Sequence, residues 1–278
     1  MRKNATARLY VSVLFVVGAL AGTASPARAQ FIRRSVGGAA AGEKYHIEAS
    51  TGIWSPGTQM AISSEALGIP GDAIDFKTDL GLTDQRFKEV HFVLRPATKH
   101  KFRYQYIPIK FEQGATITRD IVFRGQRFRI GVPVKSGIDW RAHRFSYEYD
   151  FVSLNRGFGG FILDAKYTDV RAFLESPQVR RESIHAAAPI PAAGGIFRVS
   201  PIPNLSMTGE ITGFRLPEGL IEDAKAHYLD LDFYGTFNIT NNIGAQIGYR
   251  RLDLGLTVSD DIGDFELKGF YFGLVARY

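Results

Sequence analysis

The chain has 278 residues, of which 45% are hydrophobic and 13% aromatic, with 29 glycines and no cysteine. This apolar content is too high for a disordered chain, and the length allows one large domain or two small ones. The lack of cysteine excludes a disulfide scaffold, a thiolate metal site and a cysteine nucleophile.

The first 29 residues have the pattern of a secretory signal peptide. Three cations form a basic start, residues 9–21 are an apolar run, and Ala27 and Ala29 frame a small-x-small cleavage site. The run is shorter than the roughly 20 residues that a membrane-spanning helix needs. We therefore predict a cleaved signal rather than a helical anchor.

Removal of this segment also changes the charge of the protein. Four of the cations behind the formal net charge of +6 lie in the signal, which has no acid, so the mature chain carries about +2. This balance does not support nucleic-acid binding. Residues 30–43 are small and polar without periodicity, and we interpret them as a flexible periplasmic segment.

From residue 44 onward, apolar and polar residues alternate. In 228–239, for example, Leu231 and Phe233 fall on one face and Asp230 and Asp232 on the other. Since successive side chains of a strand point to opposite faces, this pattern predicts strands with one apolar and one polar face. Ten are expected, at about 44–54, 86–95, 100–113, 135–151, 158–175, 193–200, 205–216, 227–239, 243–258 and 265–278.

The connections between these strands alternate in length. Long ones are expected at 55–85, about 113–135, 176–191, 217–226 and 259–264, and short turns lie between them. Short periplasmic turns and long outer loops are typical of outer-membrane barrels, whose strand number is even. A spanning hairpin around Arg124–Gln126 would raise the count to twelve. Failure of the weak strand at 193–200 and one neighbour would lower it to eight.

The polar faces carry full charges in mid-strand, and the apolar faces are rich in Tyr and Phe, as interfacial girdles are. We therefore predict an all-β protein, a single antiparallel up-and-down transmembrane barrel formed by residues 44–278. A soluble β-sandwich or a lipocalin-like binder is the alternative.

The C-terminal segment supports the membrane prediction. It ends on Tyr278, with Gly273 five positions earlier and alternating apolar residues between them, although Ala276 is smaller than usual. It resembles the terminal targeting strand of Gram-negative outer-membrane barrels, which the barrel-assembly machinery recognises. The resemblance implies a bacterial outer-membrane location, with lipid and lipopolysaccharide as surroundings. The oligomeric state stays open.

Three further segments carry a wider resemblance. They are Ile74–Leu82 in the first long loop, His100–Tyr104 at the start of the third strand and Gly244–Arg250 in the ninth. With them the mature chain resembles a group of bacterial outer-membrane β-barrels without an established activity, of the general kind of the outer-membrane protein A membrane domain. The resemblance implies the fold and the compartment, and it brings no activity to particular residues.

The sequence lacks the common catalytic motifs, and no two of its six histidines have metal-ligand spacing within one element. We predict no enzyme, no cofactor and no metal site; Asp230 and Asp232 are explained by Arg250 on the next strand. An enzyme acting at the outer rim is kept as an alternative, because His143, His185 and His227 lie toward the outer ends of strands or in loops.

The polar faces predict what lines the lumen: Arg103, Arg144, Glu148, Asp164, Lys166, Glu210, Asp230, Asp232, Gln246 and Arg250. Acids and bases are nearly balanced in this set. They could pair across a narrow or closed lumen, since small barrels are mostly filled by their own side chains. They could also line a small passive pore for ions or polar solutes. We favour the closed lumen, with a structural or loop-mediated role.

Overall fold

The computed structural model describes residues 40–64, 71–179, 181–217, 219, 224–258 and 261–278. The predicted signal peptide, including Ala27 and Ala29, lies outside these residues. The strands in the described part are β1 (Ile47–Ser63), β2 (Ile74–Asp75), β3 (Phe87–Ala97), β4 (His100–Thr116), β5 (Ile121–Phe123), β6 (Gln126–Phe128), β7 (Pro133–Leu154), β8 (Gly157–Glu175), β9 (Glu182–Ile202), β10 (Leu205–Arg215), β11 (Ala224–Asn238), β12 (Ile243–Val258) and β13 (Asp261–Arg277).

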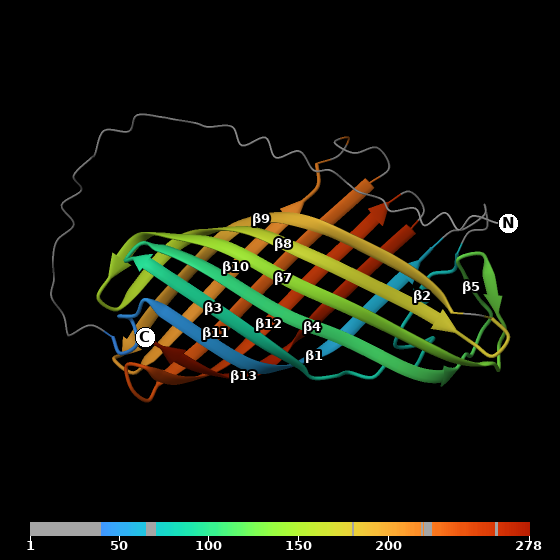
Figure 1. Ribbon diagram of the computed structural model, residues 1–278, viewed down its shortest axis with the longest axis horizontal. Helices are drawn as coiled ribbons and strands as arrows, with labels where there is room; N and C mark the ends of the chain where they lie inside the picture. The colour runs from blue at the N-terminus through green and yellow to red at the C-terminus, as the bar shows by residue number, and fades with distance from the viewer. Residues whose placement is uncertain (1–39, 65–70, 180, 218, 220–223, 259–260) are drawn as a thin grey trace, which may run out of the picture. The chain divides into compact units, whose positions relative to one another are not determined.

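Ten of these strands form one closed barrel within the described part of the chain. Each pairs antiparallel with its neighbours in the order β13-β12-β11-β10-β9-β8-β7-β4-β3-β1, and β13 pairs with β1 to close the ring. The closing ladder is continuous from Glu48 opposite Arg277 to Ser63 opposite Ile262. Figure 1 shows the strands crossing the barrel at a common tilt, as closure requires. The predicted ten-stranded, all-β, up-and-down barrel is confirmed.

The two alternative strand counts are wrong. The weak strand at 193–200 is part of β9, which is 21 residues long. The hairpin near Gly125 forms a separate two-stranded sheet, β5–β6, beyond the end of the barrel wall. Its turn is tight, because Arg124 and Gly125 both have positive φ, at 50° and 72°. In the described residues, no helix is long and apolar enough to cross a membrane.

Three predicted loop boundaries are also wrong, because the wall is taller than the alternating segments suggested. β1 continues to Ser63 rather than ending at 54, β9 begins at Glu182, inside the loop expected at 176–191, and β13 begins at Asp261, inside the loop expected at 259–264. Each extension pairs with a strand that reaches the same height: β1 with β13, β9 with β8, and β13 with β12. Each added residue satisfies backbone hydrogen-bonding groups whatever its side chain, so the ladder continues where the alternation fades.

The polarity of the wall inverts halfway along the strands. In β7, Arg144 and Glu148 point inward in the half near the short turns, and Phe145 points outward. In the other half Trp140 points inward and Arg141 outward. The same inversion occurs in β4, β8, β12 and β13. One half of the barrel is therefore apolar outside and polar inside, and the other half has the reverse arrangement of a water-soluble protein.

The half near the long loops is filled by an apolar cluster, here called the outer core. The walls contribute Trp54, Met60, Ile107, Ile109, Phe111, Ile138, Trp140, Leu252, Leu254, Phe265 and Leu267. The connections between wall strands, with their short strands β2, β5 and β6, contribute Ile74, Phe76, Leu80, Leu82, Ile117, Ile121, Phe123 and Phe128. The loop after β1 thus folds into the barrel mouth. Such a core excludes water from this end of the interior.

The short-turn end is closed by the segment before β1. Ala40 and Ala41 donate backbone hydrogen bonds to the carbonyls of Asn155 and Pro203 in two of the short turns. Tyr45 is buried beneath the guanidinium groups of Arg95 and Arg277. The interpretation of 30–43 as flexible is therefore wrong for residues 40–43.

Candidate functional site: the barrel interior

The interior of the apolar-outside half holds one continuous chain of ion pairs, here called the charge ladder. Acids and bases alternate along it, with each consecutive pair of charged groups within 4 Å. In order its members are Asp150, Lys101, Glu148, Arg103, Glu210, Arg144, Asp164, Lys166, Asp230, Arg250, Glu89 and His91. They come from seven strands around the barrel, so the ladder ties opposite walls together.

Two features explain why these side chains meet: the register between neighbouring strands, and the alternation of side chains between the inward and outward face of each strand, here called parity. Glu148 of β7 lies opposite Lys101 of β4 in the antiparallel ladder, and their charged atoms are 2.5 Å apart. Arg250 of β12 lies opposite Asp232 of β11, yet it binds Asp230, two residues along the same face, at 2.7 Å. Directly opposite and diagonal neighbours on one face of a sheet are the pairs within reach of long side chains.

The centre of the ladder spans the lumen. Glu210 of β10 accepts a hydrogen bond from Arg103 of β4 at 2.8 Å and another from Arg144 of β7. Because β10 and β4 are not neighbours in the barrel, the contact between Glu210 and Arg103 crosses the interior. Glu210 is almost fully buried, and Arg103 retains little exposure. A buried carboxylate is tolerated only when it is paired and hydrogen-bonded in this way.

A second ion-pair group lies below the ladder at the short-turn end. Arg277 of β13 donates to Glu48 of β1 at 2.5 Å and to the side-chain oxygen of Asn238 at 2.7 Å. Arg198 approaches Glu43 of the closing segment at 3.4 Å. This group fixes the segment across the end of the lumen.

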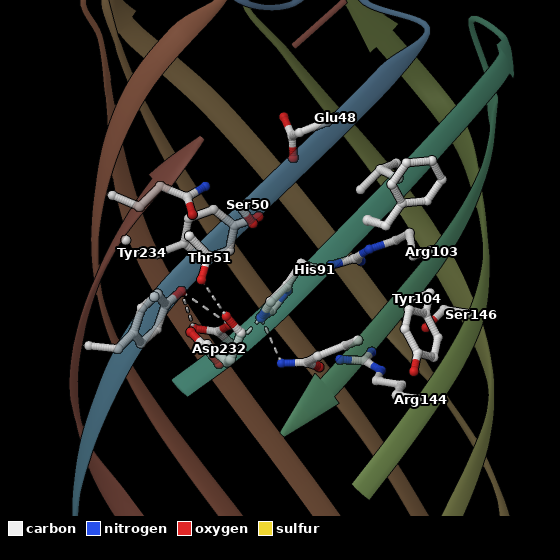
Figure 2. Close-up of a pocket in the computed structure, with 18 residues that line it drawn as sticks. Glu48, Ser50, Thr51, His91, Arg103, Tyr104, Arg144, Ser146, Asp232 and Tyr234 are labelled. Carbon is white, nitrogen blue, oxygen red and sulfur yellow. Dashed lines mark hydrogen bonds and ion pairs between the residues drawn. The ribbon is translucent and has the colours of Figure 1, made fainter. Parts of the chain in front are cut away.

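Asp232 and its neighbours line a polar cavity beside the ladder. Figure 2 shows His91, Asp232 and Arg144 pointing into this space from different strands. Asp232 accepts a hydrogen bond from the Tyr271 hydroxyl at 3.0 Å, and the Tyr271 ring lies over Gly248, where any Cβ would be 2.4 Å from it. About 40 Å³ of the cavity is open to the centres of water molecules, which is room for a few waters.

The structure places all ten predicted lumen residues inside the barrel. Eight belong to the charge ladder; Asp232 and Gln246 line the cavity, where Gln246 donates to the Thr236 hydroxyl at 3.2 Å. Asp230 and Asp232 do not share a ligand position, because Asp230 is bound by Arg250 and Lys166 and Asp232 by Tyr271.

The alternation within the strands also predicts that Asp150 and His91 face inward, whereas Lys101 and Glu89 of the ladder were missed in the prediction from sequence. Lys101 lies two residues before Arg103 and Glu89 two residues before His91, so extending each strand's parity by one step would have found both. Arg198 was missed because β9 lacks a clear alternation. Nothing in the sequence pattern indicated that Glu43 and Tyr45 turn into the barrel.

The three rim histidines do not converge. His143 stacks on Tyr106 and shares a hydrogen bond with Tyr104 on the outer surface. His185 pairs with Asp169 at 2.9 Å, and His227 pairs with Asp253 at 3.3 Å, each on a different part of the wall.

Comparison with known proteins gives a fold without a family. No protein-family model matches the chain, and no curated protein is significantly similar to it. Among solved structures, the outer membrane protease OmpT from Escherichia coli matches with a TM-score of 0.52 at 8% identity, over 84% of this chain and 96% of the protease.

Two other outer-membrane barrels match less well in shape. The attachment invasion locus protein Ail of Yersinia pestis has a TM-score of 0.34 at 10% identity, over 82% of this chain and 99% of Ail. The Pseudomonas putida toluene transporter TodX has a TM-score of 0.34 at 7% identity, over 84% of this chain and 90% of TodX. The likeness to OmpT supports the outer-membrane barrel fold and does not extend to residues or activity.

Proposed function

We propose that this chain is an integral outer-membrane barrel with a closed lumen, whose role is structural or mediated by its outer loops. The short turns would face the periplasm and the long loops the outside, as in known barrels of this architecture. The apolar-outside half would span the lipid. The other half, polar outside and filled by the outer core, would project into water.

The observation that carries the proposal is closure at three successive levels. Residues 40–45 cover the short-turn end, the charge ladder crosses the middle, and the outer core fills the long-loop end. A conducting path would need all three to open. Separating one partner from a buried ion pair alone costs about 3–5 kcal/mol, so spontaneous opening at the level of Glu210 would be rare.

The small passive pore is the main alternative, and the charged interior is its only support. Alternating charges of both signs would produce a transverse field in a water-filled channel. Here the same charges are within contact distance of one another, and the cavity beside them has space for a few waters only. We therefore favour the closed form.

We also propose a non-catalytic role. The similarity to a protease is one of fold, and the rim histidines pair separately with an Asp or with tyrosines.

For the C-terminal strand we propose recognition by the barrel-assembly machinery. Its last residue, Tyr278, exchanges backbone hydrogen bonds with Ile47 at the barrel seam. The projecting wall carries cations such as Arg141 and Arg171 just beyond the apolar band, where lipopolysaccharide phosphates would lie.

Single-channel recording in planar bilayers tests the closed lumen. The mature protein, refolded and shown to be a barrel by heat-modifiable migration, should give no discrete current steps at 100 mV. A matched variant that lacks residues 40–45 and 71–82 and carries Arg103→Ser, Arg144→Ser and Glu210→Ser should conduct, because it opens the short-turn end, the outer mouth and the central ladder together. Steps from the wild-type protein, abolished by bulky apolar residues at Asp232 or Arg250, would establish the pore instead.

A further inference from the structure

Three potential metal ligands meet on the outward face of the projecting half, away from the interior described above. They are His227 of β11, Asp253 of β12 and Asp264 of β13, and one ligand atom from each lies within 4.8 Å of the others. We propose that they form a binding site for a divalent transition metal of the zinc class.

The backbone register places the three side chains around one point. His227 lies opposite Gly255, and Gly255 lies opposite Asp264, so the three residues form a row across adjacent strands. Asp253 is two residues from Gly255 on the same face. The ligands thus project from three hydrogen-bonded strands of a closed wall, and their Cα positions are fixed before any metal binds.

Gly255 provides the space in the middle of this triangle. A Cβ at this position would lie 2.0 Å from Cε1 of His227 and 2.5 Å from its Nδ1. The imidazole therefore lies over the bare backbone of β12, with its Nε2 3.3 Å from Oδ1 of Asp253. Any other residue at 255 would push the ring away from the two carboxylates.

The carboxylate of Asp253 is oriented by a neighbour. Its Oδ2 accepts a hydrogen bond from Arg251 at 3.2 Å, which leaves Oδ1 facing His227. A metal ligand held by a hydrogen bond from outside the site is the usual arrangement in metalloproteins.

The donor set selects the class of metal. One imidazole and two carboxylates suit Zn²⁺, which takes nitrogen and oxygen ligands at about 2.0–2.2 Å, and Co²⁺, Ni²⁺ or Cu²⁺ in the same way. Ca²⁺ and Mg²⁺ prefer oxygen alone. His227 and Asp264 are exposed and Asp253 is partly buried, so small rotations of the two exposed side chains bring the ligand atoms to coordination distance, and water completes the shell.

The site lies in water rather than in lipid. On β13, Asp264 is six residues from Phe270, which belongs to the apolar outer band, and this corresponds to about 20 Å along the strand. Bound metal would join β11, β12 and β13 near their outer ends.

The chain offers a matched control. His185 and Asp169, on β9 and β8, form an ion pair at 2.9 Å with an equally exposed imidazole. In the described part of the chain, no third ligand joins them. If a surface His–Asp pair were sufficient to bind metal, both places would bind it; the proposal predicts binding at His227 alone.

The test is titration of the untagged mature protein in detergent with Zn²⁺ by calorimetry, and with Co²⁺ by visible absorption. We expect one equivalent to bind, with affinity at least tenfold lower in His227→Ala and in Asp264→Asn, and unchanged in His185→Ala. Gly255→Ala should weaken binding similarly although it removes no ligand. Heat-modifiable migration shows that each variant is folded.

Three results would overturn the proposal. One is binding of equal strength in wild type and His227→Ala. Another is binding without 1:1 stoichiometry that also persists in Asp264→Asn. The third is a titration of the wild-type protein in which neither Zn²⁺ nor Co²⁺ binds.

Discussion

Glu210 shows at the scale of one residue how the interior is held closed. It receives hydrogen bonds from Arg103 and Arg144, which reach it from two strands that are not its neighbours. Arg103 has one further carboxylate partner, Glu148, and Arg144 has two, Asp164 and Asp230. Networks of this kind are sensitive to the loss of one member, because the remaining charges stay buried.

We predict that Glu210→Gln lowers the free energy of unfolding in lipid vesicles by about 3 kcal/mol, the lower end of the cost of breaking a buried pair, because each arginine keeps at least one carboxylate partner. Urea titration followed by tryptophan fluorescence measures it. The control is Asp139→Asn, whose partner Arg141 is exposed; it should change stability by less than about 1 kcal/mol. Equal effects of the two changes would mean that the ladder stabilises the barrel no more than an exposed ion pair does.

Asp79 and Arg119 give a residue-scale prediction outside the membrane half. The side chain of Arg119 donates to both carboxylate oxygens of Asp79, at 2.9 Å and 2.7 Å, and this lowers the pKa of Asp79. A carboxyl whose folded pKa is lowered stabilises the fold above its ordinary pKa of about 4, and this contribution is lost as the pH falls through the lowered pKa.

We therefore expect the loop segment 74–82 to lose protection below pH 4. Hydrogen exchange of its amides, corrected for intrinsic rates, should rise between pH 5 and pH 3 in the wild type. In Asp79→Asn, exchange should already be faster at pH 5 and should show no further dependence on pH. A wild-type loop whose corrected exchange is constant over this range would contradict the assignment.

The lumen residues could be predicted from parity, since one charged residue in mid-strand determines the inward face of that strand. Which charges pair across the interior could not be predicted. The contact between Glu210 and Arg103 depends on barrel diameter and strand stagger, which a single sequence does not specify. The His227 site was missed for a related reason: its three ligands lie on separate strands and meet only through register.

At the scale of the strand, the main finding is the inversion of polarity. β8 presents Leu163 and Tyr167 outward in one half and Asp169 and Arg171 in the other. Alternation alone predicted strands and their faces. It did not show where the membrane would end. Both halves of a strand alternate between apolar and polar residues, and they differ only in whether the apolar residues face inward or outward.

We predict that Leu163→Arg, on the outward face of the apolar half, destabilises the barrel in vesicles by about 2–4 kcal/mol, the cost of a cation near the bilayer midplane. Arg171→Leu on the same strand should change stability by less than about 0.5 kcal/mol, because its position is surrounded by water. Both are measured by urea unfolding. Similar costs at the two positions would place the whole strand in one environment.

For the whole molecule, chain order and alternation were sufficient to predict a ten-stranded barrel with correct neighbours. The three closures were harder to foresee. The outer core uses loop residues such as Phe76 and Phe123, and their burial depends on a barrel tall enough to enclose them. The segment before β1 carries no periodic pattern, so its contacts with the short turns had no sequence signal.

The most direct test of the account is a spin-label scan along the outward face of β7. The chain has no cysteine, so single cysteines can be placed at 135, 139, 141, 145, 147, 149 and 151 without background. In vesicles, positions 145–149 should be accessible to oxygen and protected from a water-soluble nickel complex. Positions 135–141 should show the reverse, with the change near His143. Oxygen access along the whole strand, or nickel access along all of it, would contradict a barrel that spans the membrane with one half and projects into water with the other.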